Sequence, residues 1–277
     1  MKSGFQTVRI LGSEIHILTV SEAVDCLRQW IEAPDGECHR ITVTGFHGIW
    51  EASQDGHLRA ILNSADLWVA DGIAPVLVAR LKGMRRVRRI PGADLMDAFF
   101  RLANRQGYGS FFYGDTDATL AALQDSVQRR YPGHRICGTY SPPFRPLTSA
   151  EDERVVQMIN ETAPDVVWVG LGLPKQDRWI FKHKDQLYAP AAIGVGAAFR
   201  FHAGIVKRVP EAVGNLGLEW LWRLAMEPRK LWKRDLVDGP RFLLHVALEL
   251  LRIRKYEQDA DSELPVGPEY ADRGRRR

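Results

Sequence analysis

The chain has few cysteines and no long apolar run. Its 277 residues include three cysteines, and none has a second cysteine at the C-x-x-C spacing of metal and redox sites. Three scattered thiols do not make a disulfide framework, so a reducing, cytoplasmic setting is expected. The first residues lack the apolar stretch of a secretion signal, and no run reaches the roughly 18 apolar residues of a membrane-spanning helix. We therefore expect neither a secreted nor an integral membrane protein.

The common signatures of nucleotide and metal enzymes are also missing. There is no Walker A motif, and the turns Gly170-x-Gly172 and Gly194-x-Gly196 each lack the third glycine of a dinucleotide fingerprint. The eight histidines show none of the tight paired spacings that bind a metal. A nicotinamide enzyme is therefore not expected, whereas a nucleotide held without these signatures agrees with the sequence.

What the chain does have is a globular composition, with 45% hydrophobic and 26% charged residues. Residues 1–199 contain 22 basic and 22 acidic side chains, so the net charge of +4 arises after them. Residues 200–256 contain 12 basic and 6 acidic side chains. This excess favours contact with phosphates, nucleic acid or an anionic membrane surface, and a solvated helical face explains it equally well.

Short apolar strands alternate with amphipathic helices over the first two hundred residues. The pattern predicts strands at 7–11, 14–18, 39–44, 67–70, 110–113, 135–140, 166–170 and 191–195. Capping boxes at Thr19–Glu22 and Thr148–Glu151 begin two of the helices. Alternation with short connections predicts an α/β fold, a mostly parallel Rossmann-like sheet with helices on both faces.

The pattern changes near residue 204. We predict an α/β catalytic domain over 1–204, a basic amphipathic helical appendage over 205–256, and a disordered tail over 257–277. Within the appendage, Gly239-Pro240 is expected to break the last two helices apart. Helices that mix Trp, Leu and Arg suit a membrane surface, and ordinary core helices are the alternative.

Asp71 and Gly72 directly follow the predicted strand 67–70. Ligands of open α/β sheets bind beyond the carboxyl ends of the strands, which puts Asp71 where chemistry is usually done. Aspartate is also a favoured N-cap residue, and in that role Asp71 would merely begin the next helix. From this stretch alone, capping is the more common role.

The Asp115-Thr116-Asp117 segment has the Asp-x-Asp spacing with which some sugar-nucleotide enzymes hold a divalent cation. Both carboxylates lie where a helix is predicted to begin, so an N-cap role for Asp115 or Thr116 explains them, and we favour it. For a leaving phosphate, the basic candidates are Arg88, Arg89, Lys175 and Arg208.

Several spaced motifs carry a family resemblance: Ala65 to Gly72, Arg89-x-x-Gly92-x-Asp94, Tyr113-Gly114, Gly170-x-Gly172-x-Pro174-Lys175-Gln176, Gly194-x-Gly196-x-x-Phe199, Gly204, Arg208-Val209-Pro210 and the run from Gly217 to Pro228. In combination they resemble the WecG/TagA/CpsF family of bacterial glycosyltransferases, over about residues 7 to 245. The resemblance implies transfer of a sugar from a UDP-sugar to an undecaprenyl-diphosphate-linked acceptor in surface polysaccharide assembly. It places the protein peripherally on the cytoplasmic face of the membrane.

The resemblance makes Asp71 the general base of an inverting reaction that needs no metal or other cofactor. Such a carboxylate takes the acceptor proton while cations and amides stabilise the departing diphosphate. Acceptor contacts are implied for Thr44, His47, Arg89 and Asp94. Donor contacts are implied for Gly72, Gly92, Tyr113, Gly114, Gly170, Gly172, Lys175, Gln176, Gly194 and Gly196. Diphosphate or membrane contacts are implied for Arg208, Arg223, Arg229 and Arg234.

The chain departs from the family at the loop after strand 39–44. The family often has Thr-x-Asn there, and in this chain the asparagine position is taken by Phe46 or Thr44, depending on the register. The acceptor sugar, the donated sugar and the oligomeric state, a homo-oligomer included, stay open. A non-catalytic nucleotide-sugar or lipid-binding protein is the alternative function. A nucleic-acid-binding module is disfavoured because the aromatic residues lie among leucines on helices.

Overall fold

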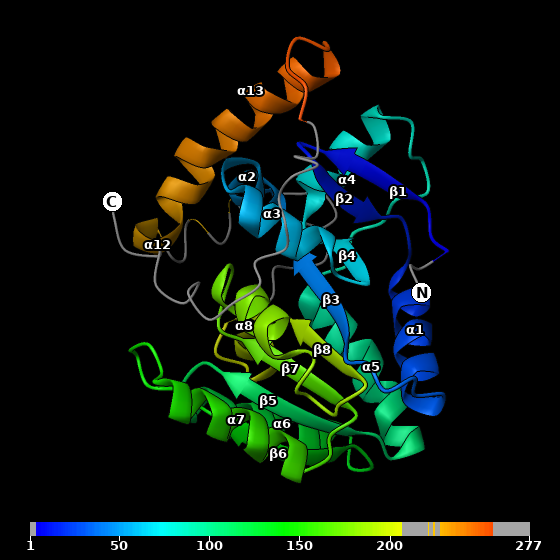
Figure 1. The fold of residues 1–277 in the computed structure, drawn as a ribbon, viewed down its shortest axis with the longest axis vertical. Coiled ribbons are helices and arrows are strands. Elements are labelled where there is room, and N and C mark those ends of the chain that lie inside the picture. The colour runs from blue at the N-terminus through cyan, green and yellow to red at the C-terminus, as the bar shows by residue number, and fades with distance from the viewer. Residues whose placement is uncertain (1–3, 207–220, 222–223, 225–227, 257–277) are drawn as a thin grey trace.

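A six-stranded parallel sheet forms the centre of the molecule (Figure 1). The computed structural model describes residues 4–206, 221, 224 and 228–256. The strands are β3 (His39–Thr44), β4 (Leu67–Ala70), β5 (Gly109–Gly114), β6 (Arg135–Tyr140), β7 (Val166–Gly170) and β8 (Ala191–Gly194), in the spatial order β4-β3-β8-β7-β5-β6. All neighbouring pairs are parallel, so every carboxyl end lies at one edge. The predicted fold class is confirmed.

Helices cover both faces of the sheet, which is why its central strands are continuously apolar or β-branched. One face is covered by α1 (Val20–Glu32), α5 (Gly92–Gln106), α6 (Asp117–Arg130) and α9 (Ala198–His202). The other face is covered by α2 (Phe46–Gln54), α3 (Gly56–Asn63), α4 (Ile73–Leu81), α7 (Ser149–Glu161) and α8 (Lys175–His183). Successive strand residues serve opposite cores, as Val69 and Trp68 of β4 do.

A short hairpin protects the outer edge of β4. Its strands, β1 (Thr7–Ile10) and β2 (Ser13–His16), pair antiparallel. The Nδ1 atom of His16 accepts a hydrogen bond from the Trp68 backbone N–H at 3.0 Å. An edge strand whose N–H is already bonded is a poor template for further pairing. Both capping boxes are present as predicted, at the starts of α1 and α7.

The predicted appendage is helical from residue 228 to residue 250, and its described residues 205–206 and 251–256 are turns, bends or irregular. The helical part consists of α12 (Pro228–Trp232), the π-helix η1 (Lys233–Asp238) and α13 (Gly239–Leu250). The predicted break at Gly239-Pro240 is wrong, because Pro240 lies in the first turn of α13, where a missing N–H costs little. No helix among the described residues is long and apolar enough to span a bilayer.

Helix α13 packs on the body of the molecule beside α2 and the hairpin (Figure 1). The rings of Phe46 and Phe242 lie 5.6 Å apart between centroids. Near the end of α13, the Glu249 carboxylate accepts from the Leu11 N–H at 3.3 Å and lies 2.8 Å from Nζ of Lys82. The appendage therefore lies above the end of the sheet that carries β3 and β4. The predicted tail, 257–277, lies outside the described residues.

Candidate active site

The carboxyl edge of the sheet brings together segments that are far apart in the sequence. Asp71 follows β4, the loop containing His47 follows β3, and the glycine turns follow β8 and β7. The pairing registers align these ends, with Thr44 opposite Ala70, and Gly114 opposite Gly170. Because ligands bind at this edge in open α/β sheets, it is the candidate site.

Asp71 is held by its backbone at the end of β4. Its N–H donates to the Thr44 carbonyl at 2.9 Å. Gly45 passes so close that a Cβ there would lie 2.7 Å from the Asp71 carbonyl oxygen. The N-cap of α4 is Gly72, at φ +89°, a conformation that suits glycine. The alternative role of Asp71 as N-cap is therefore wrong, and its side chain is partly exposed at the edge.

The two candidate acceptor residues after β3 differ in accessibility. Thr44 is 6% exposed, and a Cβ at Gly48 would lie 1.9 Å from its hydroxyl, so the hydroxyl lies under the first turn of α2. The His47 side chain is 35% exposed, and its Nε2 is 3.9 Å from Glu51 Oε1. Burial lowers the pKa of His47, the Glu51 carboxylate opposes this, and the Arg234 guanidinium lowers it further. The pKa of His47 is thus below its usual value, and the helix that carries it, α2, contacts η1.

The segment 89–94 lies next to Asp71. The Ile90 N–H donates to the Ala70 carbonyl at 2.8 Å, which brings Arg89 to the end of β4. Gly92 begins α5 directly against β8, since a Cβ there would lie 3.3 Å from the Val195 carbonyl oxygen. Asp94 lies in the first turn of the same helix. The fold therefore brings the predicted residues of this segment to the candidate site.

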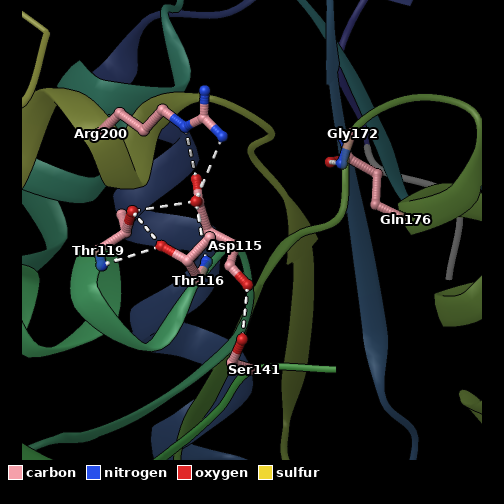
Figure 2. A network of polar contacts seen from close by, with 7 residues as sticks. All are labelled: Asp115, Thr116, Thr119, Ser141, Gly172, Gln176 and Arg200. Carbon is pink, nitrogen blue, oxygen red and sulfur yellow. Dashed lines mark hydrogen bonds and ion pairs between the residues drawn. The ribbon is translucent and has the colours of Figure 1, made fainter. Parts of the chain in front are cut away.

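Gln176 ties the two glycine turns together. Its side-chain oxygen accepts from the Gly196 N–H at 3.0 Å and from the Gly172 N–H at 3.2 Å, and Figure 2 shows it beside Gly172. The residue is 2% exposed, and a Cβ at Gly194 would lie 2.7 Å from its side-chain nitrogen. The side chain predicted to bind the donor is thus engaged inside the protein, and it occupies two of the amides that were candidates for a phosphate.

Two other predicted donor residues have contrasting positions. The Tyr113 side chain is 1% exposed and packs on Trp179, with ring centroids 4.6 Å apart, so it belongs to the core beneath α8. Burial raises the pKa of its phenol. Lys175, in contrast, is exposed at the start of α8. Gly114 and Gly170 allow β5 and β7 to approach, since a Cβ at Gly114 would lie 2.7 Å from the Gly170 carbonyl carbon.

A polar network surrounds Asp115 at the end of β5 (Figure 2). The N-cap of α6 is Thr116, whose hydroxyl accepts from the Thr119 N–H, so the capping interpretation is confirmed. Asp115 instead accepts from Nε of Arg200 at 2.8 Å and from the Thr119 hydroxyl at 3.0 Å. Burial opposes the charge of Asp115, but these bonds outweigh it and lower the pKa of the carboxyl. Sequence reasoning missed Arg200, which no motif marks.

The predicted arginines of the appendage are only partly described. Arg234 lies in η1 and donates to the Asp235 carboxylate at 2.6 and 2.9 Å. Arg229 is exposed on α12. Arg208 and Arg223 lie outside the described residues.

Within the described part of the chain, one group of three side chains is close enough to share a metal ion: Asp35, Glu37 and His39. These residues lie at the amino end of β3, at the edge opposite to Asp71. In the Asp-x-Asp segment, Asp115 is paired with Arg200 instead. The candidate site is therefore built from a carboxylate, arginines and glycine turns.

Comparison with known proteins fits this arrangement. The model of the family described as "Glycosyl transferase WecG/TagA/CpsF family" matches residues 8–256. The chain belongs to this family. The resemblance predicted from the motifs is thereby confirmed, and the protein is a glycosyltransferase by family.

Two relatives carry the same name, N-acetylglucosaminyldiphosphoundecaprenol N-acetyl-beta-D-mannosaminyltransferase. The protein from Staphylococcus aureus (strain MW2) is 32% identical over 197 residues, which are 70% of this chain and 74% of the relative. The protein from Bacillus spizizenii (strain W23) is 35% identical over 198 residues, 71% of this chain and 74% of the relative. Both names describe sugar transfer to a lipid-linked acceptor.

Proposed function

We propose that the protein transfers a sugar from a UDP-sugar to an acceptor sugar on undecaprenyl diphosphate, at the cytoplasmic face of the membrane. The relatives' names specify an N-acetylglucosaminyl diphospholipid as acceptor and N-acetylmannosamine as the transferred sugar, and we adopt the same acceptor class. The observation that carries the proposal is the position of Asp71, at the edge that also holds the glycine turns, with Gly72 in the capping role.

In the proposed reaction Asp71 is the general base. Its carboxylate accepts the proton of the acceptor hydroxyl, the hydroxyl oxygen bonds to C1 of the donor sugar, and the bond from C1 to the diphosphate oxygen breaks. UDP leaves with the electron pair of that bond. Attack opposite an α-linked leaving group inverts C1, which agrees with the β linkage in the relatives' names.

The departing diphosphate needs positive charge where its negative charge develops. Because the amides of Gly172 and Gly196 already donate to Gln176, we assign this role to cations. Arg89 lies next to Asp71, and Lys175 is exposed above β7. We propose that no metal ion takes part, so activity should survive prolonged treatment with EDTA.

We also propose that the appendage contacts the anionic membrane surface. The outward side of α13, together with its C-cap Leu251, carries an apolar stripe at helical spacing that includes Leu243, Leu244 and Leu251, which are 60%, 59% and 70% exposed. Exposed cations flank the stripe: Arg229, Lys233, Arg241, Arg252, Arg254 and Lys255. Apolar side chains that reach the acyl boundary beside cations at the headgroups are typical of interfacial helices.

The test is release of UDP from a series of UDP-sugars, beginning with UDP-N-acetylmannosamine. The assay uses the full chain and a synthetic polyprenyl-diphosphate-linked N-acetylglucosamine. We expect UDP release that depends on the acceptor, together with a β-linked disaccharide lipid. UDP binding without acceptor-dependent release from any donor would instead favour the non-catalytic alternative.

A further inference from the structure

The carboxyl edge holds a second fixed polar site, far from Asp71. Asp71 follows β4 and Asp115 follows β5, with β3, β8 and β7 between them. At about 4.8 Å per strand, the two strand ends are about 19 Å apart. A donor that joins a sugar, a diphosphate, a ribose and a base in series is long enough to extend over most of this distance.

Asp115 is built to hold Arg200 in place. Its carboxylate is 5% exposed and accepts from Arg200, from the Thr116 N–H at 2.9 Å and from the Thr119 hydroxyl (Figure 2). The backbone is in the left-handed region at φ +59°, and its carbonyl accepts from the Ser141 hydroxyl at 2.8 Å. A buried carboxylate with this many donors is saturated, so its role is to orient the guanidinium.

Arg200 is the accessible member of the pair. It lies on α9, one turn after the glycine turn of β8, and its side chain is 35% exposed. A guanidinium offers only hydrogen-bond donors, in a planar arrangement. It therefore suits a ligand that presents oxygen acceptors, as ribose and uracil do.

The order of the donor's parts follows from the chemistry at Asp71. Its C1 atom must reach the acceptor oxygen that Asp71 deprotonates, so the diphosphate lies near the ends of β3 and β8. The nucleoside then extends toward β7 and β5. We propose that Arg200 contacts the nucleoside of the donor through its N–H groups, and that Asp115 is its positioning residue. This inference rests on the proposed use of a UDP-sugar.

Competition binding of UDP, UMP and uridine to the full chain tests the assignment. We expect Arg200→Gln to weaken all three ligands by the same factor, about tenfold, because the lost bonds are to the part they share. Arg200→Lys should restore little of the lost affinity, since an ammonium group does not reproduce the planar set of donors of a guanidinium. Arg130→Lys is the matched control, because Arg130 pairs with Asp97 at 2.6 Å near the other end of α6.

The outcomes are distinguishable. The proposal is supported if Arg200→Gln weakens the binding of the three ligands by the same factor, and if its thermal unfolding midpoint is close to that of the Arg130→Lys variant. If Arg200→Gln leaves all three affinities unchanged, or weakens UDP but not uridine, Arg200 does not contact the nucleoside. Either result would be compatible with the proposed UDP-sugar activity. A wild-type protein that binds no UDP would refute the proposed donor and this inference with it. Asp115→Asn should weaken uridine binding in the same direction as Arg200→Gln.

Discussion

The two halves of the carboxyl edge are held in different ways. Around β4 and β3, the loops are fixed by backbone contacts, such as Asp71 N–H to Thr44 and Ile90 N–H to Ala70. Around β8, β7 and β5, buried side chains cross-link the loops, with Gln176 between two turns and Asp115 on Arg200. The second half is thus cross-linked by buried side chains, whereas the first half is partly exposed at Asp71 and lies beside the appendage.

Under the proposed function, the two halves of the edge bind different substrates, the donor and the acceptor. A donor that binds first benefits from a rigid surface, because less ordering is required on binding. The acceptor half needs a carboxylate that is partly exposed and a loop that meets a lipid-linked substrate. The appendage covers this half, and its η1 residues set the electrostatic surroundings of His47.

The largest effect is expected in the half held by backbone contacts. Asp71→Asn should lower turnover by about a thousandfold, because general-base catalysis contributes on the order of 10²–10⁴. The fold and the affinity for UDP should persist, since Asp71→Asn keeps the size of the side chain and the backbone N–H that donates to the Thr44 carbonyl. Acceptor-dependent UDP release measures the turnover, and calorimetry with UDP measures the affinity for UDP. Near-normal turnover would refute the assignment of the base.

In the cross-linked half, Gln176→Met should weaken UDP binding by about tenfold, since it leaves two turn amides without their acceptor. Gly194→Ala should have a similar effect, because its Cβ would displace the Gln176 carboxamide. If both act through one clamp, the double variant should be little worse than either single variant. Additive losses in the binding free energy of UDP would show that Gln176 and Gly194 act separately.

The membrane contact assigned to the covering appendage is tested on its outward stripe. Leu243→Ser with Leu244→Ser should weaken binding to anionic liposomes by at least about thirtyfold, since each lost leucine removes roughly 1 kcal/mol or more of apolar burial. Phe144→Ser is the control, because Phe144 is 97% exposed on the loop before α7. If the leucine variant and the control sediment alike, the stripe has no membrane role.

The smallest effect is expected for His39, at the amino edge of the sheet, because this edge lies outside both halves of the candidate site. Burial opposes the charge of His39, but the Asp66 and Asp35 carboxylates outweigh it and raise the pKa. The charged imidazole therefore stabilises the fold fully below about pH 6.5, and this contribution is lost as the pH rises through the folded-state pKa.

Relative to His39→Gln, the wild type should therefore have the larger advantage in unfolding free energy at pH 5.5 and the smaller one at pH 8.5. Urea unfolding at the two pH values measures the difference, and a constant difference would contradict it. UDP affinity should be the same in both proteins.

Much of the fold was predictable because the signals are local. The strands were placed by their apolar runs, and the capping boxes at Thr19 and Thr148 by their spacing. The position of Asp71 also follows from local order, since a residue after a parallel strand lies at the carboxyl edge. The break predicted at Gly239-Pro240 failed because a proline is also tolerated in the first turn of a helix.

The contacts that the site residues make could not be predicted from local sequence patterns. The side chain of Tyr113 lies in the core although its strand ends at the site. The roles of Asp71 and Gly72 were separated only by the backbone, which puts the N-cap at Gly72. Arg200 was missed because its partner, Asp115, is 85 positions away in the sequence.

The α/β class and the residues that reach the carboxyl edge follow from the sequence alone, because hydrophobic period, caps and glycine turns act over a few positions. The family follows from the resemblance of its spaced motifs. The tertiary structure decided which of those residues meet. The order β4-β3-β8-β7-β5-β6 brings Gln176 to Gly196 and Arg200 to Asp115. Contacts between loops depend on strand order, and strand order is set by how the whole chain buries its apolar faces.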